Sequence, residues 1–126
     1  MLLKKIILRN SEPFESAIEK WCVQNKVEVE IFDGKESLFD LVSAMVIMHA
    51  DHNISKENKD LRDAMQKNHK PTQEIDINGT MTASISSLRF WLENNTPENL
   101  LMVGDAKLLE NTRFEDYFNE LKVHLN

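Results

Sequence analysis

The sequence contains little cysteine, glycine or proline, and it has no long hydrophobic run. Its single cysteine, Cys22, cannot form an internal disulfide, which is typical of a protein in a reducing cytoplasm. Three glycines and three prolines in 126 residues are too few for a disordered chain. No run approaches the roughly 20 apolar residues that span a bilayer, and the N-terminal MLLKKIILRN has no signal-peptide cleavage site. We therefore expect a cytoplasmic protein with no membrane partner.

An excess of positive charge is absent too. The chain has 15 Lys and Arg against 21 Asp and Glu, which gives a net charge of −6 at pH 7. A nucleic-acid-binding surface needs clustered Lys and Arg to neutralise phosphates. The densest basic stretch, RDAMQKNHK at residues 62–70, is diluted by Asp63, and we interpret it as the solvated face of a helix. We expect no nucleic-acid partner.

The short motifs of common cofactor and nucleophile sites are also missing. The chain has no G-x-G-x-x-G after its first apolar run, no Walker lysine loop and no G-x-S-x-G elbow. His49, Asp51 and His52 have side chains of the kind that bind metals, but no further ligand lies at a suitable spacing. We therefore expect no metal ion and no resident cofactor, while NAD or another nucleotide stays a candidate ligand or substrate.

What the chain does contain is a regular alternation of apolar runs and amphipathic segments. At 41% hydrophobic and 29% charged residues it has the composition of an ordinary globular protein, and residues 1–126 fit a single α/β domain. The expected strands are separated by helical patterns and cover residues 3–8, 27–32, 42–49, 72–78 and 99–104. This order predicts a three-layer, doubly wound fold with a five-stranded, mainly parallel sheet of the flavodoxin-like kind.

The burial pattern of the expected strands favours the sheet order 2-1-3-4-5. Residues 27–32 alternate polar and apolar side chains, as an edge strand does, whereas residues 42–49 and 99–104 are almost continuously apolar. Residues 72–78 also alternate, although this order places them inside the sheet. Either this fourth strand lies at an edge, or its polar face meets a ligand or a partner.

The same fold class predicts where a ligand binds. Open α/β sheets bind ligands beyond the carboxyl ends of their strands at a topological switch point, which in this order lies between the first and third strands. The polar segments that follow these strands would meet there, and serines or a threonine would begin helices whose positive ends face the crevice. The candidate ligand-binding residues are Arg9, Asn10, Ser11, His49, Asp51, His52, Ser55 and Thr80.

The middle of the chain, MVIMHADHNISKENKDLRDAMQKNHKPTQEIDIN at residues 45–78, resembles the TIR (Toll/interleukin receptor) domains and their bacterial relatives. In that family a central strand leads through a loop to S-W-C-x-x-E-L, then to a helix and a K-P pair before the next strand. Ser55 and Leu61 match the serine and the leucine of this motif, and Asp60 falls at the glutamate. A K-P pair precedes the next expected strand.

The resemblance implies two kinds of function. TIR domains act either as docking modules that self-associate or as enzymes that cleave the nicotinamide–ribose bond of NAD. In the enzymes the helix glutamate is required, so the resemblance indicates Asp60, which is one methylene shorter, or the nearby Glu57 as the catalytic carboxylate. Ser55 would orient the ribose. The segment DINGT at residues 76–80 is also similar to a loop of nucleoside deoxyribosyltransferases.

We therefore expect a binding or protein-interaction module with a signalling role, for which a nucleotide is a candidate ligand and self-association or a protein partner is a candidate mode of action. The alternative is a nucleotide N-glycosidase or deoxyribosyltransferase-type enzyme acting on NAD or a nucleoside. Its carboxylate would stabilise an oxocarbenium-like transition state. An Asp60 side chain on the outer, solvated face of its helix would argue against that role.

Overall fold

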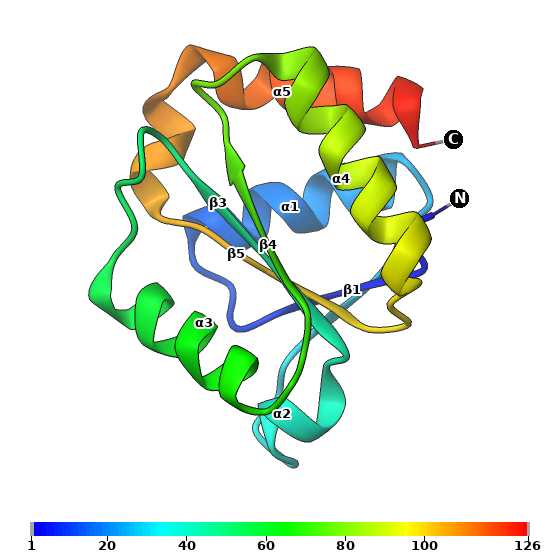
Figure 1. Ribbon diagram of the computed structural model, residues 1–126, viewed down its shortest axis with the longest axis vertical. Helices are drawn as coiled ribbons and strands as arrows, with labels where there is room; N and C mark the ends of the chain where they lie inside the picture. The colour runs from blue at the N-terminus through cyan, green and yellow to red at the C-terminus, as the bar shows by residue number, and fades with distance from the viewer. Residues whose placement is uncertain (1, 126) are drawn as a thin grey trace.

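A parallel five-stranded sheet with helices on both faces is the framework of the protein (Figure 1). In this computed structural model, residues 2–125 are described. Every pair of neighbouring strands is parallel. The strands are β1 (Lys5–Leu8), β2 (Glu28–Ile31), β3 (Ala44–His49), β4 (Thr72–Asp76) and β5 (Leu100–Val103). The predicted three-layer, doubly wound fold class is confirmed.

The two faces of the sheet carry separate hydrophobic cores. Successive strand residues alternate between them, as Ile6 and Ile7 of β1 do. The larger core lies under α1 (Pro13–Gln24), α4 (Met81–Asn95) and α5 (Thr112–His124), and the smaller one under α2 (Leu38–Leu41) and α3 (Lys56–Lys67). A 3₁₀ helix, η1 (Ala106–Glu110), connects β5 to α5. Among residues 2–125, no helix combines the length and the apolar character that a bilayer span requires.

The strands are ordered β2-β1-β5-β3-β4, so the favoured order 2-1-3-4-5 is wrong in the place of the last strand. β5 lies at the centre of the sheet because all four of its residues are apolar, and only the middle of the sheet buries both of its faces. β4 pairs only with β3 and leaves Glu74 exposed to solvent. Of the two explanations for the alternation of residues 72–78, the edge position is therefore correct.

The strand order also moves the switch point. α3, which follows β3, packs on one face of the sheet, whereas α5, which follows β5, packs on the other. The chains that leave these two neighbouring strands therefore separate, and a crevice opens between their carboxyl ends. The switch point therefore lies between β5 and β3, and β5 separates β1 from β3 in the sheet.

Of the three helix starts expected to face the crevice, only that of α3 has a side-chain cap. Ser55 caps α3, because its Oγ accepts a hydrogen bond of 3.2 Å from the backbone N–H of Asn58. Ser11 does not begin α1. The residue before that helix is Glu12, whose own N–H donates to Asn10 Oδ1 in the preceding turn. Thr80 does precede α4, but its side chain makes no capping bond.

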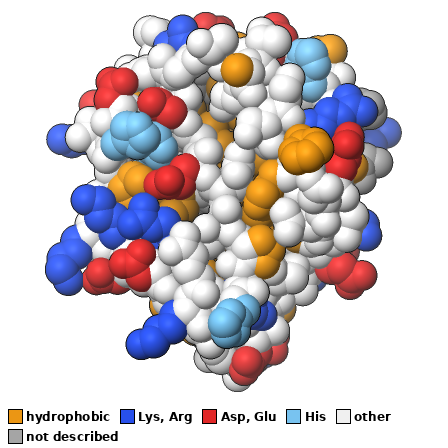
Figure 2. All heavy atoms as spheres, in the orientation of Figure 1, with side chains coloured by type: hydrophobic (Ala, Val, Ile, Leu, Met, Phe, Trp, Pro, Cys, Tyr) orange, Lys and Arg blue, Asp and Glu red, His pale blue; other side chains and the backbone are white. Residues whose placement is uncertain are grey.

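The outer surface of α3 is highly charged. Figure 2 shows Lys, Arg, Asp and Glu side chains of both signs mixed over this helix. Lys56 pairs with Asp60 on α3 itself, and Arg62 reaches Glu74 on β4 at 3.1 Å. The basic stretch at residues 62–70 lies on this mixed surface, in agreement with its interpretation as a solvated helix face.

Candidate functional site

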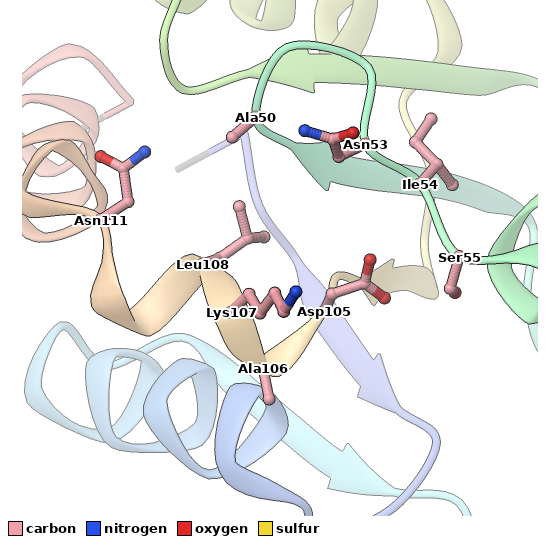
Figure 3. A pocket seen from close by; sticks show the side chains of 9 residues that line it. All are labelled: Ala50, Asn53, Ile54, Ser55, Asp105, Ala106, Lys107, Leu108 and Asn111. Carbon is pink, nitrogen blue, oxygen red and sulfur yellow. The ribbon is translucent and has the colours of Figure 1, made fainter.

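Two adjoining cavities open at the carboxyl edge of the sheet, on either side of the end of β5. The central cavity, about 600 Å³, lies between the β3–α3 loop and η1 (Figure 3), and it is lined by Ala50, Asn53, Ile54, Ser55, Asp105, Ala106, Lys107, Leu108 and Asn111. The arginine cavity, about 220 Å³, lies between the start of α1 and the start of α3. It is lined by Arg9, Asn10, Glu12, Pro13, Phe14, Glu15, Ser55, Glu57, Asn58, Gly104, Asp105 and Ala106.

The central cavity combines an aliphatic lining with polar groups that other residues leave free. Ala50, Ile54 and Leu108 supply the apolar surface. In Figure 3, Asn53 lies on the β3–α3 side, and Asp105 and Lys107 lie on the β5–η1 side. Within residues 2–125, neither the side-chain amide of Asn53 nor the ammonium of Lys107 forms a hydrogen bond with another residue. Both are therefore available to a ligand.

Asp105 belongs to both cavities and is held where they meet. It follows Gly104, which is buried against the ring of Phe14 on α1. A Cβ at Gly104 would lie 2.6 Å from Phe14 Cε2, so the close approach of α1 to the end of β5 requires glycine. The carboxylate of Asp105 accepts a hydrogen bond of 3.2 Å from Asn58 Nδ2 at its Oδ1.

A partly buried arginine and a buried asparagine connect three elements behind the crevice. Arg9, at the end of β1, donates from Nη2 to Asn58 Oδ1 at 2.7 Å and from Nη1 to Glu57 Oε1 at 3.1 Å. Asn58 is 2% exposed and uses both ends of its amide, one toward Arg9 and one toward Asp105. The chain Arg9–Asn58–Asp105 therefore links β1, α3 and β5.

Glu15 is a buried carboxylate without such partners. It is 2% exposed and lines the arginine cavity from α1. Within residues 2–125, its carboxylate accepts no hydrogen bond from any other residue. Burial raises the pKa of Glu15, its own backbone N–H and the charge of Arg9 lower it, and the negative charges of Glu12 and Glu57 raise it. The arginine cavity therefore contains a buried carboxylate whose only hydrogen-bond donor is its own backbone N–H.

Some of the predicted site residues meet at this crevice and others do not. Arg9, Asn10, Ser55 and Glu57 line the arginine cavity. Asp60 lies on the outer surface of α3, where its side chain is 63% exposed and pairs with Lys56 at 3.1 Å. The structure therefore places the proposed catalytic Asp60 outside both cavities. Ser11 and Thr80 are exposed and also lie outside them.

The histidines shape the β3–α3 loop and do not line either cavity. His49 is 2% exposed, and its Nδ1 accepts a hydrogen bond of 3.1 Å from the backbone N–H of His52. The two rings stack with centroids 4.8 Å apart. Asp51 and His52 both adopt left-handed backbone conformations, with φ of 55° and 65°.

An aspartate at the end of β4 holds this strained turn. Asp76 Oδ1 accepts from the backbone N–H of Asp51 at 3.1 Å and from that of Asn78 at 2.9 Å. The turn delivers Asn53 to the central cavity. Within the described part of the chain, no group of three or more His, Cys, Asp or Glu side chains is arranged to hold a metal ion.

Glu15, Asn58 and Asp105 were missed in the sequence. Glu15 falls three and seven residues before Ile18 and Cys22 on the apolar stripe of α1, and Asn58 falls seven before Met65 on that of α3. A polar residue on an apolar stripe was therefore a usable signal for both. No local signal in the sequence marks Asp105, because its place between the two cavities depends on the central position of β5.

No family model matches this chain, and neither a curated protein nor a solved structure matches it. The similarity of residues 45–78 to TIR domains therefore stays an expectation.

Proposed function

We propose that this domain is a binding module for a small, uncharged ligand of the nucleoside type, held in the central cavity. The observation that carries the proposal is a cavity of about 600 Å³ at the switch point between β3 and β5, with an aliphatic lining and free polar groups. Small-molecule sites are mostly apolar clefts of roughly 300–1,000 Å³ with a few polar groups that fix orientation. Their usual place in an open α/β sheet is this edge.

The side chains that line the cavity match the parts of such a ligand. A planar base would pack against Ala50, Ile54 and Leu108. The amide of Asn53 offers both a donor and an acceptor to the edge of the base. The second carboxylate oxygen of Asp105, which no other described residue engages, would accept a hydrogen bond from a sugar hydroxyl.

The charges around the crevice support a nucleoside over a phosphorylated nucleotide. Glu12, Glu15, Glu57 and Asp105 line the two cavities, whereas the cationic side chains are Arg9 and Lys107. Arg9 is already paired with Glu57. The partial positive charges at the starts of α1 and α3 face these carboxylates of the protein itself. A phosphate would therefore meet a negative field.

Calorimetric titration tests this proposal. Adenosine, inosine and cytidine are titrated separately, and AMP and NAD serve as the charged comparison. We expect at least one nucleoside to bind, and its monophosphate to bind about tenfold more weakly because of charge repulsion. Asn53→Ala and Asp105→Asn should weaken binding, while Asp60→Asn, on the outer surface of α3, should not. Binding of no nucleoside, or tighter binding of AMP, would overturn the proposal.

The enzymatic alternative is hydrolysis of the N-glycosidic bond of the same ligand. It is favoured by Asp105 and Glu15, two carboxylates in adjoining cavities, because negative charge stabilises an oxocarbenium-like transition state. Water would form a bond to C1′ as the C1′–N bond breaks, and the base would leave with a proton. Chromatography of nucleosides incubated with the protein would detect free base. Equal base release by the wild type and by Asp105→Asn would exclude this role for Asp105.

A further inference from the structure

We propose that the arginine cavity is a second binding site, which takes the primary ammonium group of a small organic amine through Glu15. This site is separate from the nucleoside site proposed for the central cavity and does not depend on it. The two cavities adjoin at Ser55, Asp105 and Ala106, but Glu15 lines the arginine cavity alone.

The burial and the hydrogen bonding of the Glu15 carboxylate are the first reason to expect a cation in this cavity. A carboxylate that is 2% exposed ordinarily receives hydrogen bonds from its surroundings, because an ionised group without them is costly to bury. Within residues 2–125, Glu15 receives none from another residue, although it lines a cavity that reaches solvent. Its carboxylate interacts with its own backbone N–H, and an ammonium group would supply further donors and a positive charge in direct contact.

The neighbouring Arg9 donates no hydrogen bond to the Glu15 carboxylate. Arg9 directs Nη1 to Glu57 and Nη2 to Asn58, and its Nε is buried without a hydrogen-bond partner in the described chain. Its positive charge is thus shared among Glu57 and the other carboxylates of the cavity, Glu12, Glu15 and Asp105. The cavity keeps an excess of negative charge, and a cation is the ligand that balances it.

The side chains that line the arginine cavity favour an organic cation over a metal ion. Within residues 2–125, no group of three or more His, Cys, Asp or Glu side chains is placed to coordinate a metal. Asp105 is occupied at Oδ1 by Asn58, and Glu57 is occupied by Arg9. What Glu15 offers is a single buried acceptor group. Hydrogen bonds from an ammonium suit one such carboxylate, whereas divalent ions take several oxygen ligands.

The dimensions of the cavity limit the size of the group. A volume of about 220 Å³ exceeds by several times the roughly 30 Å³ that one water molecule occupies in the liquid. An ammonium with a short alkyl chain fits this space, and a small quaternary ammonium fits it too but has no N–H group to donate to Glu15. The proposal therefore predicts selectivity for a primary amine over a quaternary one.

The direct test is titration of the full chain with 1,4-diaminobutane at constant ionic strength, followed by calorimetry. We expect saturable binding with one site per chain. Glu15→Gln keeps the shape of the side chain and removes its charge, so it should weaken binding about tenfold or more. The matched control is Asp60→Asn, which removes an exposed carboxylate and should leave binding unchanged. Tetramethylammonium should bind at least tenfold more weakly than the diamine.

A second measurement reports on Glu15 itself. The side-chain carboxyl resonance of Glu15, followed by NMR against pH, should titrate at lower pH when the diamine is present, because a bound cation favours the ionised carboxylate. Equal diamine binding by the wild type and by Glu15→Gln would overturn the proposal. So would equal weakening by Asp60→Asn, which would show binding to general surface charge. Nucleoside binding is tested through Asn53→Ala, so either proposal can fail without the other.

Discussion

Arg9 Nη2 and Asn58 Oδ1 lie 2.7 Å apart, and this bond joins the end of β1 to the first turns of α3 behind the candidate site. The residues are 49 positions apart in the chain, and the asparagine is 2% exposed. Asn58 also holds Asp105 through Nδ2. One buried amide thus orders an arginine and an aspartate of opposite charge.

Removing this amide should destabilise the protein. Asn58→Ala leaves the Arg9 guanidinium with one fewer acceptor and Asp105 without its donor, so we expect the free energy of unfolding to fall by about 2–3 kcal/mol. Urea denaturation followed by circular dichroism measures this change. Lys59→Ala, at the exposed position that follows, is the control and should cost much less. Equal losses in both variants would show that the buried contacts of Asn58 contribute nothing.

Substitution of Gly104 should be destabilising for a steric reason. In Gly104→Ala the new methyl group would lie 2.6 Å from Phe14 Cε2 and 2.9 Å from Leu108 Cδ1, so α1 or η1 must shift. Overpacking of this kind costs about 1–3 kcal/mol, which thermal unfolding detects. Phe14→Leu should partly relieve the clash in the double variant. An additive double variant would mean that the clash with Phe14 does not determine the cost.

The buried His49 should make stability depend on pH. Burial lowers its pKa in the folded protein, and the negative charge of Asp76 only partly opposes this effect. His52 also lowers this pKa, while Glu74 and Asp51 raise it. The unfolded chain therefore takes up the proton first, and stability should decline as the pH falls below about 6.5. Protonation would also remove the Nδ1 acceptor of the His52 N–H.

His49→Gln tests this pH dependence. Urea midpoints of the wild type and the variant are compared at several pH values between neutrality and pH 5. Because glutamine does not titrate, the variant should lose less stability over this interval than the wild type. An identical loss in both proteins would assign the pH dependence to other groups.

Glu15 should make stability depend on pH in the opposite direction to His49. Burial raises its pKa in the folded state above the usual value, so the ionised form is the one that folding disfavours. The resulting loss of stability is absent at low pH and sets in as the pH rises through the usual glutamate pKa toward the raised one. We therefore expect Glu15→Gln to be more stable than the wild type at pH 7.

This difference should disappear under acidic conditions. Below the usual glutamate pKa of about 4.3, the wild-type carboxyl is neutral in both states, and the two proteins should unfold alike. Chemical denaturation at pH 7 and near pH 3.5 makes the comparison. Lower stability of Glu15→Gln at pH 7 would mean that the carboxylate already has a stabilising partner.

Local properties of the sequence were enough for the fold class and for part of the site. The alternation of polar and apolar residues marked 72–78 as a strand with one solvent-exposed face. The continuous apolar run at residues 99–104 marked a strand buried on both faces. Ser55 was recognisable as a helix cap because capping depends on its own helix. Arg9 and Asn10 were assigned to the crevice because the carboxyl ends of parallel strands share one edge.

The strand order, and with it the composition of the site, was decided by tertiary structure. β5 enters between β1 and β3 through hydrogen bonds between segments about 50 to 95 residues apart, and no local periodicity records that pairing. That insertion brings Asp105 to the junction of the two cavities, where Asn58 contacts both Asp105 and Arg9. Periodicity and capping act within a few residues, so they define elements. The choice of strand neighbours depends on how the whole sheet buries its apolar faces, so it defines the site.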